Sequence, residues 1–422
     1  MGVAIGFFSF KLALWCLLLV AFTEVGCYFL VHYLRKDFQW LITPRDFFPV
    51  IDKKGFLQFI DHGYDAELGW VRKPNTEKDE TGKHGRTQYH IDDRGSRSNP
   101  GHEALPKVIS CYGDSFVFCR QVNDNETFQW YLSEMTKTNV LNFGVGNYGL
   151  DQALLRLKRE YPSNRTKIVI MGVVPSTIVR ILCVWKHYNE FGNVLGFKPR
   201  FLLRNGQLEL VSNIINDKEK FERYREFVPE INRYDYFYET KFRKDMLSFP
   251  YSVAVLNNPA RNVPLLAMVA RDRWFGRRKK DQPYPPPMSI IMKSNLKLRE
   301  QLFLRDSDAV ALLERLGQEF AAYGKENNFV PVFLWMPQKD DLLRIREKAN
   351  YYEAFIDRIQ KNMLTIDLTG ELINREDFDD LYSDDNRYGG HYSKQGNLLI
   401  AGIILARLSR YNIFGKGENL HG

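Results

Sequence analysis

Five short apolar runs, each rich in β-branched residues, divide the chain downstream of residue 106 into repeating blocks. Runs of this length that are bounded by polar turns are typical of buried parallel strands. The segments between them carry apolar residues at helical spacing, so strands and helices alternate. This alternation predicts a parallel sheet between two layers of helices. The predicted strands are 107–112, 140–145, 167–174, 329–336 and 364–368, and the predicted helices are 126–138, 151–160, 307–327, 349–361 and 394–410.

The alternation stops between about 183 and 305, which we interpret as an insertion rich in Phe, Tyr and Arg. Within it, the apolar stretch 263–270 precedes the basic run 271–280, which also contains Trp274 and Phe275. This combination is typical of a segment that rests on a membrane surface. It also fits a cap over an active site that meets an acidic or sugar substrate, or a solvated loop after a packed helix.

The N-terminal stretch 12–34 is apolar except for Glu24, His32 and a few small polar residues. It is long enough to cross a hydrocarbon core of about 30 Å, and it is longer than the apolar region of a cleavable signal peptide. We therefore expect an uncleaved, single-pass anchor. Lys11 precedes it and Arg35 follows it, so the flanking charges leave its orientation open. Glu24 is costly in lipid unless it is paired or protonated, which leaves room for a partner membrane protein.

The sequence predicts three parts. Residues 1–36 form the anchor, and the polar, irregular region 37–105 forms a linker and an N-terminal layer laid on the main domain. Residues 106–415 form the α/β domain that carries the insertion. The segment 89–95 is expected to be a strand that runs into a turn. A length of 422 residues with 44% apolar residues suits one large domain or two ordinary domains.

Charge, histidine and cysteine usage exclude several classes of function. The net charge of +8 is spread along the chain, without the dense basic stripe of a nucleic-acid-binding protein, so we expect no nucleic-acid partner. Histidines are scattered without metal-binding spacing, so we expect neither a metal nor another cofactor. The five cysteines form no disulfide framework. For Cys111 and Cys119 we expect buried free thiols, and a bridge between them is the alternative.

The tripeptide Gly113-Asp114-Ser115 directly follows the first predicted strand. In an open α/β sheet, ligands and chemistry collect at the carboxyl ends of the strands. A serine held there at the start of a helix is a candidate nucleophile if a base reaches it. The same tripeptide is also a common turn or helix N-cap.

Two further segments supply what such a nucleophile needs. The second predicted strand ends in the glycine-rich turn 144–147, whose backbone N–H groups are candidate oxyanion donors. His391 lies on a glycine-flanked loop just before the last predicted helix and suits general base catalysis. Asp384 and Asp385 lie upstream and are candidates to orient its ring. Taken alone, each segment also fits an ordinary turn or polar surface.

Taken together, and in their order along the chain, the three segments resemble those of the SGNH (GDSL-type) hydrolases. The flanking sequence looks like that of bacterial members of the family. The resemblance covers 107–180 and 329–410 and leaves the insertion unmatched. It implies a flavodoxin-like three-layer α/β/α sandwich. The matching segments are Gly113-Asp114-Ser115, Asn142-Phe143-Gly144 and His391, with flanking similarity at 67–70, 122–128 and 148–152.

By this resemblance, Ser115 would be the nucleophile and His391 the base. The oxyanion hole would consist of the backbone N–H of Ser115 and a donor from the second turn, where Gly144, Gly146 and Asn147 are the candidates.

Two positions depart from the family pattern. The family's third block is Gly-x-Asn-Asp, whereas 171–177 reads Met-Gly-Val-Val-Pro-Ser-Thr and has no Asn. One oxyanion donor is therefore missing or supplied elsewhere, for example by Asn147. The family's acid lies three residues before the histidine, where this chain has Tyr388. The acid would then be Asp385 or Asp384, a backbone carbonyl, or absent.

The leading hypothesis is a membrane-anchored serine esterase, with its soluble domain outside the cytoplasm. It would remove an O-acyl group from a carbohydrate or cell-envelope substrate through an acyl-enzyme on Ser115. One alternative is an O-acyltransferase that passes the acyl group to a sugar hydroxyl. The other is a non-catalytic glycan-binding or scaffold protein on an SGNH fold, which the missing Asn and the displaced acid would favour.

Overall fold

A computed structural model describes residues 2–82, 85–275, 286–384 and 390–410. The chain divides into two compact units, and the predicted insertion contributes to both. The first unit contains Met1–Val50, Tyr188–Gly192 and Tyr236–Asn295, and the second contains Ile51–His187, Asn193–Asp235 and Leu296–Gly422.

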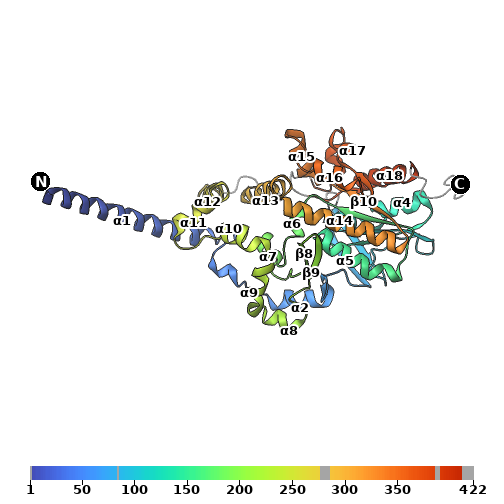
Figure 1. Cartoon of the computed structure of the whole chain (residues 1–422), viewed down its shortest axis with the longest axis horizontal. Helices are drawn as coiled ribbons and strands as arrows, with labels where there is room; N and C mark the ends of the chain where they lie inside the picture. The colour runs from blue at the N-terminus through green and yellow to red at the C-terminus, as the bar shows by residue number, and fades with distance from the viewer. Residues whose placement is uncertain (1, 83–84, 276–285, 385–389, 411–422) are drawn as a thin grey trace. The chain divides into compact units, whose positions relative to one another are not determined.

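The second unit is built around a five-stranded, fully parallel sheet (Figure 1). Its spatial order is β11-β10-β7-β5-β6. Read from β6, and with the strands numbered by their place in the chain, this is the order second, first, third, fourth and fifth, which is that of flavodoxin-like folds. The predicted parallel sheet is confirmed. Its strands are β5 (Lys107–Gly113), β6 (Asn139–Gly144), β7 (Ile168–Val173), β10 (Val330–Trp335) and β11 (Leu364–Asp367).

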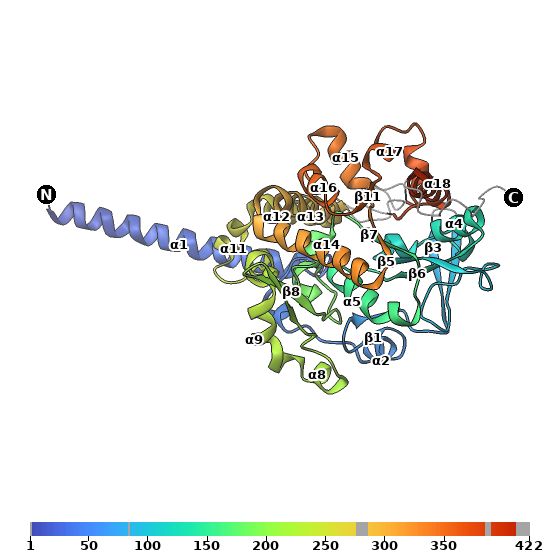
Figure 2. The ribbon, with the colours of Figure 1, turned by 45° about the vertical axis from the view of Figure 1, so that its right-hand side comes forward.

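Helices cover both faces of this sheet, because successive strand residues point to opposite sides. Ile109 and Cys111 join the core under α4 and α18, whereas Tyr112 stacks on Phe143 on the face of α5. Figures 1 and 2 show α18 and α5 on opposite sides of the sheet. The first layer contains α4 (Phe128–Thr136), α15 (Lys339–Glu347), α17 (Thr369–Ile373) and α18 (Lys394–Arg410), and the second contains α5 (Leu150–Glu160), α14 (Ser307–Asn327) and α16 (Glu353–Ile359).

An N-terminal layer lies before the sheet in the sequence and includes an antiparallel pair, β3 with β4. The strand predicted near residue 89 is β4, which ends in a turn stabilised by Asp92. The elements of this layer are α2 (Lys53–His62), β1 (Tyr64–Asp65), β2 (Gly69–Trp70), β3 (Thr76–Gly82) and β4 (Gly85–Ile91).

Several elements were not predicted from the sequence, and many of them lie in the insertion. Strands β8 and β9 pair through Asn205-Gly206, a dipeptide that favours tight hairpin turns. The remaining elements of the second unit are α3 (Ser115–Phe118), α6 (Thr177–Arg180), β8 (Arg200–Arg204), β9 (Gln207–Val211), α8 (Lys218–Glu222), α9 (Tyr224–Tyr234), η2 (Asp124–Glu126), η3 (Tyr161–Ser163) and η5 (Phe378–Leu381), and α7 (Lys186–Asn189) and α13 (Pro286–Arg305) have residues in both units.

The first unit begins with the long helix α1 (Gly2–Leu34). Its segment Phe10–Leu34 is long and apolar enough to cross a membrane, and only 6% of its most apolar stretch is buried, so it is a candidate anchor or signal sequence. Its C-terminal end packs into a small core through Val31 and Leu34. The other elements of this unit are η1 (Pro44–Phe47), η4 (Tyr238–Phe242), α10 (Arg243–Asp245), α11 (Tyr251–Asn257) and α12 (Pro259–Trp274).

Candidate active site

Ser115 lies at the point where the direction of strand addition in the sheet reverses. β5 has β6 on one side and β7 on the other, and the crevice at the carboxyl ends of β5 and β7 is where flavodoxin-like folds bind ligands. A side chain at Gly113 would collide with the carbonyl oxygen of Gly172 on β7. Only glycine lets the two strands approach this closely, so Gly113 sets the position from which α3 starts.

Ser115 is the first residue of α3, and the cap of this helix defines its surroundings. The carboxylate of Asp114 caps the helix by accepting the N–H of Phe116 at 2.9 Å. Ser115 itself is 6% exposed, and its Oγ makes no hydrogen bond to any residue that the structure describes. Its backbone N–H is at the first helical position, where no intrahelical acceptor exists. The hydroxyl and the N–H are therefore both available to a ligand.

The carboxylate of Asp114 forms a buried ion pair with Arg180, so its role is structural and it is not available as a general base. Its second carboxylate oxygen accepts Arg180 Nη1 at 2.5 Å, and the same nitrogen donates to the carbonyl of Tyr148 at 3.0 Å. Both side chains are at least nine-tenths buried. Arg180 belongs to α6, which follows β7, so this pair links the ends of β5 and β7. Removing one partner of such a buried pair leaves an uncompensated charge.

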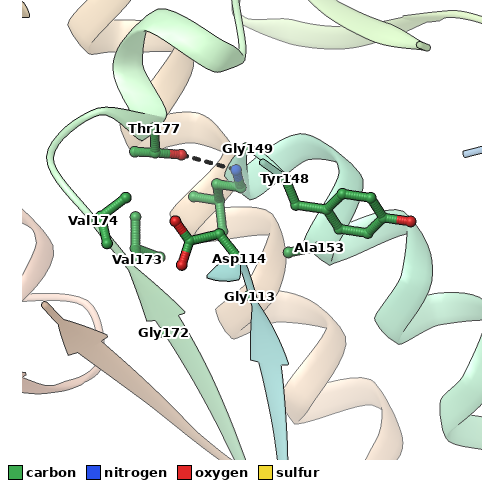
Figure 3. Close-up of a pocket in the computed structure, with 10 residues that line it drawn as sticks. Gly113, Asp114, Tyr148, Gly149, Ala153, Gly172, Val173, Val174 and Thr177 are labelled. Carbon is green, nitrogen blue, oxygen red and sulfur yellow. Dashed lines mark hydrogen bonds between the residues drawn. The ribbon is translucent and has the colours of Figure 1, made fainter. Parts of the chain in front are cut away.

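A cavity of about 10 Å³ lies beside Asp114 and has room for about one water. Figure 3 shows Asp114 among its lining residues, with Gly113 and Gly172 at the ends of the two strands. Thr177 contributes a hydroxyl that accepts the N–H of Leu150 at 2.9 Å. The cavity is too small for a substrate, so it belongs to the packing of the strand ends.

The structure brings His391 to the α3 segment. Its ring contacts the ring of Phe116, the residue after Ser115, with centroids 4.8 Å apart. Its backbone N–H and its Nδ1 both approach Oε1 of Gln121, at 3.1 and 2.9 Å. The backbone N–H can only donate, so the Gln121 atom is the amide oxygen, and Nδ1 must carry the proton. Nε2 is then the basic nitrogen, and it has no hydrogen-bond partner among the described residues.

The surroundings of His391 oppose its protonation. Burial, and then the positive charges of Arg120 and Arg180, lower the pKa of His391 from 6.5 to about 3. The ring is therefore neutral at physiological pH, as a general base requires. The same causes oppose the imidazolium that forms when the base takes up a proton, so the site lacks the electrostatic support that a carboxylate supplies.

The N-terminal layer holds Gln121 in place. Gln121 has a left-handed backbone, with φ of 68°. Glu80 on β3 accepts its backbone N–H at 3.1 Å and the Nε of Arg120 at 2.9 Å. Arg97, which follows β4, donates to the carbonyls of Phe118, Cys119 and Val122 in the same loop. Sequence reasoning missed Gln121, Glu80 and Arg97, because no motif marks a loop that is supported from outside the sheet.

The second glycine-rich turn keeps two of its N–H groups free. Gly144 N–H donates to Oδ1 of Asn142 at 3.0 Å, and Val145 N–H donates to the carbonyl of Gly113 at 3.0 Å. Within the described ranges, the N–H groups of Gly146 and Asn147 have no acceptor. Asn147 has φ of 67°, a left-handed conformation that asparagine tolerates. Of the three candidate donors in this turn, Gly146 and Asn147 are therefore available and Gly144 is occupied.

The structure describes one of the two candidate acids, Asp384, and not the other, Asp385. Asp385 lies outside the described residues. Asp384 is half-buried, and its carbonyl oxygen accepts Lys339 Nζ at 3.4 Å. The acceptor that the structure records at Nδ1 of His391 is Gln121.

The described residues contain no group of three or more His, Cys, Asp or Glu side chains that could hold a metal. All five cysteines are free. Cys111 and Cys119 are both buried, and burial raises the pKa of each thiol. The predicted free thiols beside Ser115 are confirmed, and they are not poised to react.

No protein-family model matches the chain, and no curated protein matches it. Solved structures do. One is a protein described as lipolytic and of the G-D-S-L family from Desulfitobacterium hafniense DCB-2, with 12% identity, a TM-score of 0.31, and coverage of 72% of this chain and 99% of that one. Another is a two-domain esterase active on acetylated mannans, with 9% identity, a TM-score of 0.31, and coverage of 72% and 49%. A third is an α/β hydrolase from the metagenome of Lake Arreo, Spain, with 10% identity, a TM-score of 0.33, and coverage of 74% and 98%.

Proposed function

We propose that the chain is a membrane-anchored serine esterase that removes an O-acyl group from a carbohydrate or cell-envelope substrate outside the cytoplasm. One observation carries the proposal. A serine whose hydroxyl has no partner among the described residues starts a helix at the carboxyl end of a flavodoxin-like sheet. The residue after it packs against a histidine whose Nε2 has no partner in the same described ranges. Acyl transfer needs a nucleophile within reach of a base, and the nearness of His391 to the residue after Ser115 supports the proposal.

In the proposed reaction, Ser115 Oγ gives its proton to Nε2 of His391 and attacks the acyl carbon. The carbonyl oxygen becomes negative and is stabilised by N–H groups of Ser115, Gly146 and Asn147. The bond from the acyl carbon to the alcohol oxygen then breaks, and the alcohol leaves with the proton from His391. Water next gives a proton to His391 and attacks the acyl-enzyme. The bond from the acyl carbon to Ser115 Oγ then breaks, Oγ takes back the proton from His391, and the carboxylic acid departs.

Gln121 is a positioning residue in this scheme. Its amide oxygen fixes the proton on Nδ1 and keeps Nε2 basic, which is one task of the carboxylate in a Ser-His-Asp triad. It supplies no negative charge, so the imidazolium gains less stabilisation than in a triad. We therefore expect slow turnover of unactivated esters and faster turnover of activated ones.

The test uses the full-length protein in detergent, with p-nitrophenyl acetate and an O-acetylated oligosaccharide as substrates. Ser115→Ala should lower kcat/KM by at least about 10³-fold, because the nucleophile is lost. Ser163→Ala, which changes an exposed serine in η3, should leave it unchanged. A fluorophosphonate should add to Ser115, as seen by mass spectrometry. Unchanged hydrolysis by the Ser115→Ala protein would refute the proposal.

The same assay separates an esterase from an O-acyltransferase. With a deacylated glycan present, an esterase releases free acid, whereas a transferase yields the acylated glycan through the same acyl-enzyme.

A glycan-binding protein without catalysis is the second candidate. The lowered pKa of His391 favours it, because a base of pKa about 3 is weak near neutral pH. Binding of an O-acetylated glycan without turnover, unaffected by Ser115→Ala, is the result expected from this candidate.

A further inference from the structure

An exposed, uncharged apolar surface covers α11 and α12 in the first unit. Between Met246 and Ala270 the only charged residue is Arg261, which is 3% exposed and pairs with Asp245 at 3.4 Å. The exposed face of this stretch therefore presents apolar and small polar groups alone. Its large exposed side chains are Phe249 (76% exposed), Val253 (53%), Leu256 (67%) and Val263 (49%).

Hydrogen bonds hold the start of α11 against the membrane-crossing part of α1. The carboxylate of Glu24 accepts the backbone N–H of Tyr251 at 2.6 Å, and both the N–H, at 2.9 Å, and the hydroxyl of Ser252. The sequence alone leaves open what pairs with Glu24 in lipid. In the structure, its partners Tyr251 and Ser252 come from the same chain. Figures 1 and 2 both show α11 beside α1.

A second contact places the other end of this surface. Arg273, near the end of α12, donates to the hydroxyl of Tyr33 at 3.1 Å and to the carboxylate of Asp37 at 2.9 Å. Asp37 follows the end of α1, where the chain becomes polar. α12 therefore ends level with the polar end of α1, whereas α11 begins level with Glu24.

These two contacts give the depth of the surface. At 1.5 Å per residue, Glu24 lies about 15 Å along the helix axis before Leu34. A hydrocarbon core of about 30 Å needs about 20 residues of helix, so the apolar segment between Lys11 and Leu34 places Glu24 inside it. The start of α11, fixed to Glu24, then lies inside it as well.

We propose that α11 and the exposed face of α12 are embedded in the lipid monolayer that surrounds the C-terminal half of α1. The first unit then carries a membrane-embedded surface beside α1 and is not a fully solvated domain on a stalk. Lipid acyl chains are the partner that fits, because the surface is apolar, lacks charge and continues the lipid-facing surface of α1. Trp274 and Phe275 are 61% and 84% exposed at the end of α12, where aromatic side chains favour the membrane interface. This inference does not rest on the proposed esterase activity.

The test measures contact with lipid in the full-length protein. Cys16 and Cys27 are replaced by Ala, and Cys111, Cys119 and Cys183 stay because they are buried. A bimane label is then attached to Val253→Cys or Leu256→Cys, in phosphatidylcholine vesicles that carry a nitroxide on the acyl chain. Leu18→Cys in α1 is the lipid-facing reference, and Leu210→Cys on β9 is the water-facing reference.

We expect quenching at Val253 and Leu256 close to that at Leu18, and little quenching at Leu210. Quenching at both α11 positions no greater than at Leu210 would overturn the proposal. In that case, a disulfide between two Leu256→Cys copies would identify a second copy of the chain as the cover. Two labelled positions guard against one variant that misfolds, and circular dichroism confirms that each variant is folded.

Discussion

At the scale of single residues, the partner of His391 decides what the site can do. A carboxylate at Nδ1 would raise the pKa of the histidine, whereas the neutral amide of Gln121 leaves burial and the charges of Arg120 and Arg180 unopposed. His391 therefore stays neutral well below the pH at which a free histidine becomes protonated. Gln121 thus orients the ring of His391, as a triad acid does, but supplies no negative charge to stabilise the imidazolium.

The pH dependence of turnover follows from this lowered pKa. A base is active when it is unprotonated, so kcat/KM should not fall through protonation of His391 until the pH approaches its pKa of about 3. Gln121→Glu should raise the pKa of His391, move the acid limb towards neutral pH and increase the rate above that limb. The measurement is kcat/KM for p-nitrophenyl acetate between pH 4 and pH 9, limits of roughly the range in which histidine bases are assayed.

Gln121→Ala is the matched control for this prediction, because it removes the orienting oxygen without adding charge. It should lower the rate and leave the acid limb in place. A wild-type acid limb near 6.5 would contradict the lowered pKa and indicate a carboxylate beyond the described residues, with Asp385 as the first candidate.

At the scale of elements, the junction between β5 and α3 determines where Ser115, the proposed nucleophile, lies. The strand reaches the crevice only because Gly113 allows contact with Gly172, and the helix begins only because Asp114 caps it. A change in this junction should affect stability and activity together.

Gly113→Ala tests this coupling. The added methyl group would collide with the backbone of Gly172 and the side chain of Val117, so the free energy of unfolding should fall by about 1–3 kcal/mol. Displacement of Ser115 should lower kcat/KM by roughly 10²-fold. Thermal unfolding in detergent and ester hydrolysis provide the two measurements.

Gly402→Ala in α18 is the control, because a side chain there meets no atom within 4 Å. It should raise the free energy of unfolding by up to about 1 kcal/mol, as alanine favours helix over glycine. If Gly113→Ala behaves like this control, close approach of the strands does not set the position of Ser115.

The elements of the sheet could be predicted from the sequence, whereas the support of the site could not. Buried parallel strands leave a strong local pattern, so all five strands, and the helices α4, α5, α14, α16 and α18, appear where periodicity predicts them. The candidates Ser115 and His391 follow from motifs, one at the end of a strand and the other on the loop before the last helix. Gln121 and Glu80 are ordinary polar residues whose roles depend on the contact between β3 and the loop after α3. That contact is tertiary and leaves no local pattern.

At the scale of the whole molecule, the two units share one interleaved chain, which passes between them five times. The candidate site lies within the second unit, and the contact between Glu24 and α11 lies within the first. Substitutions that remove the contact of Glu24 should therefore change the stability of the first unit and leave the candidate site unaffected.

Glu24→Leu tests this division. It removes the acceptor for Tyr251 and Ser252, so local opening of α11 should become easier, with faster amide hydrogen exchange at these residues. Ester hydrolysis should keep its wild-type rate. Glu24→Gln keeps one acceptor oxygen, so its rate of amide exchange in α11 should lie between those of the wild type and of Glu24→Leu. Thr23→Val, which changes the neighbouring residue, is the control. Unchanged exchange in α11 would show that the contact does not hold this helix.

The contact between Glu24 and α11 also imposes an order on the synthesis of the chain. Tyr251 follows Glu24 by 227 residues, an interval of roughly 10–45 s at ordinary translation rates. For α1 as the proposed anchor, the carboxyl group of Glu24 would enter the membrane before its partners Tyr251 and Ser252 are made. The proposed anchor would reach its final contacts only once α11 emerges, after more than half of the protein has been synthesised.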